Sequence, residues 1–510
     1  MNLYVPLELL ALLHINLAKM KRSVTIFLIT CIALFINQFI ITAFKPDNRD
    51  PKLARSTNTC NCYASSSLYN IVIQFNNKVP GDLAAFNNQS QADCFAWQEF
   101  ISLNWPINPS GYFGTPGDTS PVSWEAYMPI DVLFQPDGVQ PSSWGTLVSP
   151  QYAARFKSQR LLMNPTKTKL LTFTTKFAAD SVFGLDPDQA APIGSPNWLG
   201  AQNNTNVWYE IKLNKDYYDF VIKNGYYNAI TQHDSVQKGI PINFPQGVYN
   251  GPVGAIEVKA AWMEVDNINS PKWQRYKLSN ATVYDSATGN FRQTVVALVG
   301  LHILHKTQNQ PTWVWATFEQ VDNVPDTNSK TTPPYGYNFY TANCTPRQVS
   351  LHGGGTATVS CTANTSPPYF LSQAGPVPVQ VTRLNPIDPT DAVPINNMMQ
   401  SNIKKFYPQS VFQYYELVDV IWSQTLQPDK TTPIQVPFPL NTSAMLSGAH
   451  VVANTTLESY VQNTNTCYSC HKYSTIAPFP ADSVNNNIFG DFSFAISAAQ
   501  YPVSKAKKKR

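Results

Sequence analysis

The sequence predicts an α+β fold rich in β-structure: a large, mainly antiparallel β body with short helices and a C-terminal helical segment. Only 13% of the 510 residues are charged and 43% are hydrophobic, so the chain can bury a large core. The 40 prolines and the many aromatic residues favour short strands and ordered loops over long solvated helices. In the middle of the chain, apolar residues alternate with charged ones, as is typical of half-buried strands.

The strands are predicted between residues 207 and 321. Val207–Leu213 and Ala255–Val265 alternate apolar and charged residues, which gives each strand one buried face. Gln293–His305 is almost entirely apolar, and Trp313–Val321 follows it after a short polar turn. These last two segments are predicted to form a hairpin.

Three helices are predicted. Asp93–Pro106 has an aspartate at the N-cap, apolar residues at helical spacing and a proline at its end. Gln409–Trp422 and the short segment Thr455–Gln462 are the other two. Folding is therefore expected to begin near Asp93.

An uncharged stretch near the N-terminus, Ser23–Phe44, has about the ~20 residues that cross a bilayer. Basic residues precede it, which places its N-terminal side in the cytoplasm and the rest of the chain outside. Ile41–Ala43 is a weak cleavage site, so an uncleaved anchor is favoured over a signal peptide. Met20 and the basic residues after it form an ordinary signal start, so residues 1–19 are interpreted as an upstream extension of the reading frame.

These observations define a domain organisation. It comprises a cytoplasmic N-terminus at 1–22, a transmembrane anchor or signal peptide at 23–44, a polar linker at 45–90, a β-rich body at 91–440, a C-terminal segment packed on that body at 441–503 and a basic tail at 504–510.

Export would place most of the eight cysteines in an oxidising compartment, where disulfides form. Cys344 and Cys361 are predicted to pair, because two short alternating runs around a triple glycine lie between them and form a hairpin. Cys94 is predicted to pair with Cys60 or Cys62. The sequence leaves this choice open, and one thiol remains.

The most specific motif is Cys467-Tyr468-Ser469-Cys470-His471. Two cysteines separated by two residues and followed by histidine are the attachment signature of a c-type haem, whose vinyl groups react with the thiols while the imidazole binds the iron. A redox dithiol would need a thioredoxin-like βαβ setting, and a zinc site would need a second ligand pair. The sequence contains neither and predicts one covalent haem c on Cys467 and Cys470, with His471 as the proximal ligand.

The second axial ligand of the iron must come from upstream, because no histidine or methionine follows His471. His302 in the apolar strand is the leading candidate for a distal ligand, and a core histidine hydrogen-bonded to backbone is the alternative. His305 leaves the other face of the same strand and is expected at an exposed strand end. The remaining candidates are His450, Met263, Met398, Met399 and Met445.

Several stretches carry a resemblance to a known family. They are DCFAWQEFISLNWP at 93–106, IEVKAAWMEV at 256–265, VALVGLHILHKTQNQPTWVWATFEQVDNVP at 296–325, ANTTLESYVQNTNTCYSCH at 453–471 and DFSF at 491–494. They resemble a large, poorly characterised bacterial family of exported proteins with a single C-terminal cytochrome c motif. The resemblance implies one haem c in the cell envelope and no particular activity. The family pattern often has histidine where this chain has Gln320, so no ligand is required there.

The predicted function is that of an exported, membrane-tethered monohaem c-type cytochrome. It would transfer single electrons to an unidentified redox partner on the extracytoplasmic side of a bacterial inner membrane. Two alternatives are a peroxidase-like haem oxidoreductase and a binding module in which haem is a sensor or a structural pin.

No catalytic residue is assigned. Glu99, Glu257, Glu319 and Asp322 lie on separate elements, and such carboxylates are more often surface groups than catalytic pairs. The net charge of +4 comes without a basic face, which argues against a nucleic-acid partner.

Overall fold

The computed structural model describes residues 58–63, 71–108, 111–158, 168–172, 198–285, 290–326, 332–350, 355–367, 377–422, 451–463, 467, 471, 474–477 and 489–502. All of them belong to one compact unit that begins at Thr57. The predicted membrane segment 23–44 and the tail 504–510 lie outside the described residues. Within the described part of the chain, no helix is both long and apolar enough to cross a membrane.

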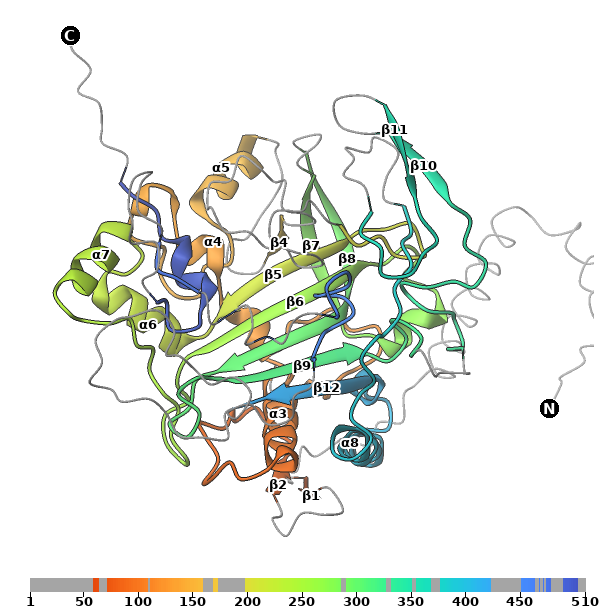
Figure 1. The fold of residues 1–510 in the computed structure, drawn as a ribbon, viewed down its shortest axis with the longest axis horizontal. Helices are drawn as coiled ribbons and strands as arrows, with labels where there is room; N and C mark the ends of the chain where they lie inside the picture. Colours follow the sequence, from red (N-terminus) through yellow and green to blue (C-terminus); the bar gives the residue numbers. More distant parts are fainter. Residues whose placement is uncertain are drawn as a thin grey trace, which may run out of the picture. The chain divides into compact units, whose positions relative to one another are not determined.

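Eight strands form the central sheet (Figure 1). They are β3 (Met128–Pro129), β4 (Lys169–Leu171), β5 (Val207–Leu213), β6 (Ile256–Glu264), β7 (Leu278–Asp285), β8 (Asn290–His305), β9 (Val314–Gln320) and β12 (Tyr415–Ile421). The order is β12-β9-β8-β6-β5-β3, and β7 joins the sheet beside β8 with β4 at its far side. Every pairing is antiparallel except that of β4 with β7. The predicted β-rich α+β fold is therefore confirmed.

The hairpin of β8 and β9 lies at the centre of the sheet, as predicted. His302 is opposite Thr317 on β9 and opposite Lys259 on β6. Because successive side chains of a strand leave opposite faces, His302 and His305 lie on different sides of the sheet.

One face of the sheet is covered by α3 (Gln89–Leu103) and α8 (Ala392–Phe406). Leu301, Ile303 and Phe318 of the sheet pack there in one hydrophobic cluster with both helices. The start of α3 corrects the prediction: its N-cap is Asn88, whose side-chain oxygen accepts from the backbone N–H of Gln91 at 3.0 Å. Asp93 lies inside the helix and is fully buried.

The other face is covered by α4 (Ile130–Leu133), α6 (Lys215–Asn224), α7 (Ala229–Gln237) and the C-terminal residues 489–502, which include the 3₁₀ helix η5 (Phe494–Ala498). In Figure 1, α6, α7 and the blue C-terminal segment lie together at one end of the sheet. Leu304 and Trp315 of the sheet belong to their hydrophobic cluster. We call this side of the sheet the C-terminal face.

Shorter elements complete the fold. They are β1 (Thr59–Cys62), β2 (Ile71–Gln74), β10 (Arg347–Ser350), β11 (Thr356–Val359), α5 (Pro150–Ser158) and the 3₁₀ helices η1 (Ser123–Ala126), η2 (Pro136–Gly138), η3 (Pro271–Arg275) and η4 (Val411–Tyr414).

Two predicted helices are wrong. The segment 409–422 forms η4 and the edge strand β12, because its apolar residues pair with β9. The side-chain amide of Asn396 accepts from Leu417 N at 2.9 Å and donates to Leu417 O at 2.7 Å. It thereby satisfies the backbone groups of Leu417 at the sheet edge, as a neighbouring strand would. The segment 455–462 forms turns, because its side chains bond to the sheet.

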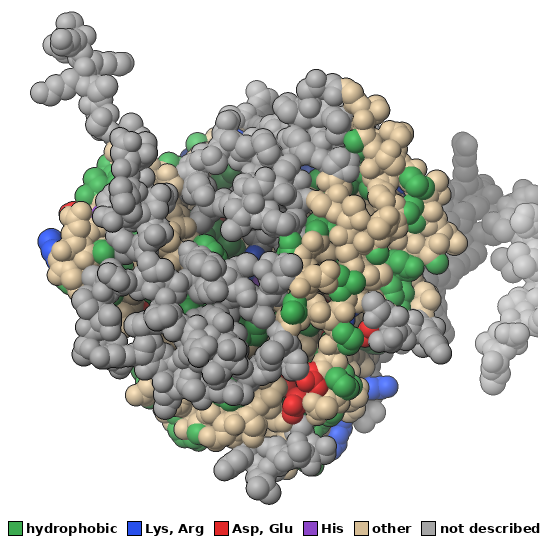
Figure 2. Space-filling model, viewed as in Figure 1, with side chains coloured by type: hydrophobic (Ala, Val, Ile, Leu, Met, Phe, Trp, Pro, Cys, Tyr) green, Lys and Arg blue, Asp and Glu red, His purple; other side chains and the backbone are tan. Residues whose placement is uncertain are grey.

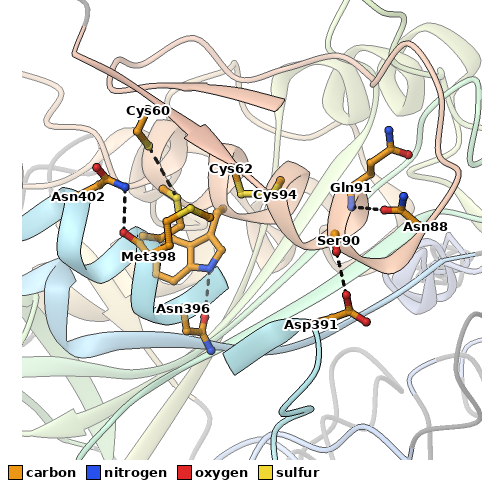
Figure 3. Close-up of a disulfide and its surroundings, with 12 residues drawn as sticks. Cys60, Cys62, Asn88, Ser90, Gln91, Cys94, Asp391, Asn396, Met398 and Asn402 are labelled. Carbon is orange, nitrogen blue, oxygen red and sulfur yellow. Dashed lines mark hydrogen bonds between the residues drawn. A yellow bond between two sulfur atoms is a disulfide. The ribbon is translucent and has the colours of Figure 1, made fainter. Parts of the chain in front are cut away.

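The described residues form two disulfides, Cys62–Cys94 and Cys344–Cys361. The second closes the β10–β11 hairpin, which is the pairing expected from the sequence. The first settles the open choice and leaves Cys60 as a thiol beside the disulfide (Figure 3). The sulfur of Cys60 lies 4.0 Å from that of Met399. Burial raises the pKa of Cys60 to about 11, so this thiol is not ionised at neutral pH.

The first of these disulfides also corrects a predicted boundary. It joins β1 to α3, and β1 pairs with β2, so both short strands belong to the folded body. The folded body therefore begins by Thr59, within the range predicted as a linker (45–90).

Uncharged and hydrophobic side chains predominate among the described atoms of the face in Figure 2. Lysine and arginine appear on it only as scattered spots. The charged side chains considered below are instead mostly buried between the sheet and the segments that cover it.

Candidate functional site

The candidate site is built around the cysteine–histidine motif on the C-terminal face. Cys467 and His471 are both described and both have helical backbone conformations, whereas Cys470 lies outside the described residues. Cys467 is half-buried and packs against the hydrophobic cluster to which Leu304 and Trp315 belong. The described residues of the motif therefore lie against the body.

The side chain of His471 is fixed by one hydrogen bond and two aromatic rings. Its Nδ1 lies 2.8 Å from the carbonyl oxygen of Phe492. A carbonyl only accepts, so Nδ1 carries the hydrogen and Nε2 presents its lone pair. The rings of Trp315 and Phe494 contact the imidazole edge-to-face, with centroids 4.5 and 4.9 Å away.

Electrostatics keep this imidazole neutral. Burial of the ring lowers the pKa of His471 to about 3, and the positive charges of Lys259 and His302 act in the same direction, while the Phe492 carbonyl opposes them. A neutral imidazole with one nitrogen donating to a carbonyl is the form that binds metal ions through the other nitrogen.

The segment that precedes the motif is bonded to the sheet by side chains. Asn454 donates to Thr317 Oγ1 at 2.9 Å and to Phe318 O at 3.0 Å. The backbone N–H and the hydroxyl of Thr455 donate to the carboxylate of Glu319 at 2.6 and 2.5 Å. Residues 454–458 therefore lie across β8 and β9, and we call them the docking segment.

His302 completes this contact. Its Nε2 donates to Glu458 Oε1 at 2.9 Å, and only 6% of the residue is exposed. His302 and Trp315 lie on the same face of the sheet, so the predicted distal candidate lies beneath the docking segment on the side where His471 packs. Burial would raise the pKa of Glu458, but the positive charge of His302 and its hydrogen bond lower it, so Glu458 is the anionic partner.

Gly300 lets the docking segment approach the sheet. A Cβ atom at this position would lie 2.1 Å from Thr456 Oγ1 and 3.0 Å from Asn454 Oδ1. Both distances are shorter than ordinary van der Waals contacts, so no larger side chain fits without a shift of the segment.

Replacing Gly300 with alanine is therefore expected to lower the free energy of unfolding by about 1–3 kcal/mol, the usual cost of overpacking. Urea unfolding of the single variants and of Gly300→Ala combined with Thr456→Ala measures it. The double variant should be more stable than the sum of the single effects predicts, because the second change removes the clashing oxygen. Equal stability of Gly300→Ala and the wild type would contradict the close contact.

The structure corrects the position of His305. It is fully buried on the α3 side, where Nδ1 lies 2.5 Å from Glu99 Oε1 and Nε2 lies 2.5 Å from Val253 O. Both nitrogens face acceptors, so the ring is an imidazolium paired with a buried carboxylate. This side of the sheet is opposite His471, and His305 takes no part in the candidate site.

The four carboxylates expected at the surface are also buried, and this prediction is wrong. Glu99 bonds to His305, Glu257 to Ser493, Glu319 to Arg383 and Thr455, and Asp322 to Arg275. Each has a partner from a distant part of the sequence, which a sequence pattern cannot reveal.

The remaining ligand candidates divide into two groups. Met399 is fully buried beside Cys60 on the α8 side, with Met398 next to it. Met263 of β6 is buried in a separate hydrophobic cluster that includes Leu457. Cys470, Met445 and His450 lie outside the described residues. Gln320 is buried and bonds to Asp322, so its role is structural.

Sequence reasoning missed the role of Phe492 in the site. In the sequence, the DFSF stretch carries only the family resemblance, and Phe492 acts through its backbone carbonyl, which any residue could supply. A signal appears only in three dimensions: Phe492 has a φ of +64°, an uncommon conformation for a bulky residue.

His471 could serve as an iron ligand of a covalently attached haem, because its hydrogen bond to Phe492 leaves Nε2 as the nitrogen with a lone pair. Within the described residues, no three or more His, Cys, Asp or Glu side chains are grouped so that they could bind a metal ion by themselves.

Comparison of the chain with protein-family models, curated proteins and solved structures found no significant match.

Proposed function

We propose that this protein is a membrane-tethered monohaem c-type cytochrome that transfers single electrons in the bacterial cell envelope. The observation that carries the proposal is the hydrogen bond from His471 Nδ1 to Phe492 O, which leaves Nε2 as the ligand atom. When bound, the haem would supply reversible one-electron chemistry at its iron.

The protein's own residues have distinct tasks in this proposal. Cys467 and Cys470 attach the haem, and His471 binds the iron. Trp315 and Phe494 hold the imidazole ring in one orientation. An apolar surrounding of this kind is one of the means by which a protein tunes a reduction potential.

The cellular setting rests on the sequence and the disulfides. Ser23–Phe44 would tether the chain to the inner membrane, with the body on the extracytoplasmic side. Two disulfides fit an oxidising compartment, where haem attachment also takes place. The redox partner would be another component of the envelope.

A second candidate function has one observation in its favour. The His302–Glu458 pair lies on the same face of the sheet as the ring that contacts His471. A histidine paired with a carboxylate can act as a general base, which a peroxidase-like haem oxidoreductase requires. In this alternative, the neutral form of His302 would take up the proton of a peroxide instead of binding the iron.

Replacing both Cys467 and Cys470 with alanine is expected to abolish covalent haem, because no thiol then remains at the motif. The full chain is produced together with haem-maturation machinery, and haem is detected by its stain on a denaturing gel. Cys60→Ala is the matched control and should retain the full stain, because Cys60 lies on the other side of the sheet. A haem stain that persists in the double variant would contradict the proposal.

The spectra of the same wild-type protein separate the two candidate functions. A low-spin ferrous form that ignores carbon monoxide supports electron transfer. A high-spin form that binds carbon monoxide and reacts with peroxide supports the oxidoreductase.

A further inference from the structure

The backbone is strained where the C-terminal segment meets His471. Asp491, Phe492 and Trp313 have φ values of +54°, +64° and +71°. The other non-glycine residues with positive φ in the described part of the chain are Asp or Asn, which tolerate this region. Phe492 and Trp313 are bulky, and each such conformation costs about 1–3 kcal/mol. It persists only where surrounding contacts compensate.

Those contacts converge on Asp491. Its carboxylate forms an ion pair with Lys306 and accepts from the backbone N–H of Phe244 at 2.7 Å. Its carbonyl oxygen accepts from the indole N–H of Trp313 at 2.9 Å. Lys306 is itself fixed by Asn243, 2.7 Å from its ammonium group.

The ion pair ties the turn at Asp491 to the central hairpin. Lys306 directly follows β8 and Trp313 directly precedes β9, so these two residues, which both bond to Asp491, are attached to this hairpin. Lys306 and Asp491 are 2% and 6% exposed, so water does not screen the pair. The hairpin thereby fixes Asp491, and the next residue along the chain directs its carbonyl at His471 Nδ1.

We infer that Asp491, paired with Lys306, is a positioning residue for the iron ligand: it holds the left-handed turn that presents the Phe492 carbonyl to His471. The inference rests on the proposed function and deepens it. Without the pair, the turn relaxes toward an ordinary backbone conformation and the carbonyl moves away from Nδ1. The contacts of Asp491 are with Lys306, Phe244 and Trp313, so its effect on the imidazole passes through the neighbouring carbonyl of Phe492.

The consequence is a change in the electronic character of the ligand. A histidine that donates Nδ1–H to a carbonyl is a more basic ligand through Nε2, and a more basic ligand favours ferric iron. Weakening this hydrogen bond should therefore raise the midpoint potential.

The test is Asp491→Asn in the full chain, which preserves size and tolerance of the left-handed region but removes the negative charge. Asp219→Asn is the matched control, because Asp219 forms an exposed i,i+4 pair with Lys215 on α6. We expect Asp491→Asn to keep its haem stain and to lose about tenfold in preference for ferric iron. This loss corresponds to a rise of about 59 mV for a one-electron couple. The control should match the wild type.

A second measurement does not need haem. In the Cys467→Ala/Cys470→Ala protein, the ¹⁵N chemical shifts of His471 report its tautomer. We expect the Nδ1–H tautomer to predominate, and Asp491→Asn to convert it to a mixture.

These outcomes separate the proposed function from the positioning role of Asp491. A wild type without covalent haem contradicts the proposed function, and the role of Asp491 is then tested by the tautomer of His471 alone. Asp491→Asn protein that is less stable but has an unchanged potential and tautomer overturns the inference, because the ion pair is then only structural.

Discussion

Replacing His305 with alanine is expected to lower the free energy of unfolding by about 3–5 kcal/mol, because it leaves the Glu99 carboxylate buried without its cationic partner. Both side chains are completely inaccessible to solvent. His305 also stacks on Phe95 of α3, with ring centroids 5.7 Å apart, so the variant loses packing as well. Urea unfolding followed by tryptophan fluorescence measures the change.

The stabilisation by His305 should depend on pH. Burial alone would lower the pKa of His305, but Glu99 and the Val253 carbonyl raise it, so the net shift is upward. A raised pKa contributes stability that is complete below the ordinary value of about 6.5 and is lost as the pH rises through the folded-state value. Burial also raises the pKa of Glu99. The contribution of Glu99 to stability therefore also falls as the pH rises, and this fall begins at a lower pH than that of His305. The difference between wild type and His305→Ala should therefore shrink as the pH rises above 6.5.

His302→Ala is the control for this substitution. His302 leaves the same strand on the other face, and its partner Glu458 retains 24% of its side-chain exposure, so water can solvate the carboxylate that remains. His302→Ala should lower the free energy of unfolding by less than His305→Ala does. A change in the ferric spectrum of His302→Ala would identify His302 as a ligand or a neighbour of the iron. Equal stability costs for the two histidines would contradict the burial of the His305–Glu99 pair.

Replacing Glu319 with alanine should also cost about 3–5 kcal/mol. Glu319 is fully buried and accepts from Arg383 at 3.0 Å and from both donors of Thr455. The variant leaves the guanidinium of Arg383 buried, with Glu416 3.5 Å away and Asp326 as a further nearby carboxylate. It also removes the acceptor for the docking segment, so limited proteolysis should cut within residues 451–463 faster than in the wild type.

Glu416→Ala is the matched control for Glu319. Glu416 lies opposite Glu319 on β12 but keeps 25% of its side-chain exposure and makes the longer contact with Arg383. Glu416→Ala should lower the free energy of unfolding by less than Glu319→Ala does. It should also leave the docking segment protected from proteolysis. Protection of the segment in Glu319→Ala would show that Asn454 and Glu458 hold it without Thr455.

The strands were predictable because their signal is local. Alternation along 207–213 and 255–265 gives the period of a pleated strand whatever the partners are, although the structure buries both faces of these strands. The run that ends at His305 is recognised by its apolar residues and the polar turn that follows it. The β8–β9 hairpin followed from a short turn between two such runs. The disulfide of Cys344 and Cys361 followed for the same reason, since a hairpin brings its own ends together.

The wrong predictions concern segments whose partners are distant. Residues 415–421 have helical spacing of apolar residues, yet they form a strand because β9 offers an edge and Asn396 satisfies the other side. His305 was expected at an exposed strand end because the sequence cannot show that Glu99, far along the chain, lies over it. Tertiary packing outweighs local propensity in both cases.

The sequence alone supplies the motif on which the proposed site rests, because a haem c motif needs only two thiols and an imidazole at fixed spacing within five consecutive residues. Only the tertiary structure decided which nitrogen of His471 is presented. That depends on the carbonyl of Phe492, and on the strained turn that Lys306, Phe244 and Trp313 fix around Asp491. These contacts join parts of the chain far apart in sequence, and the key acceptor is a backbone atom that every residue possesses.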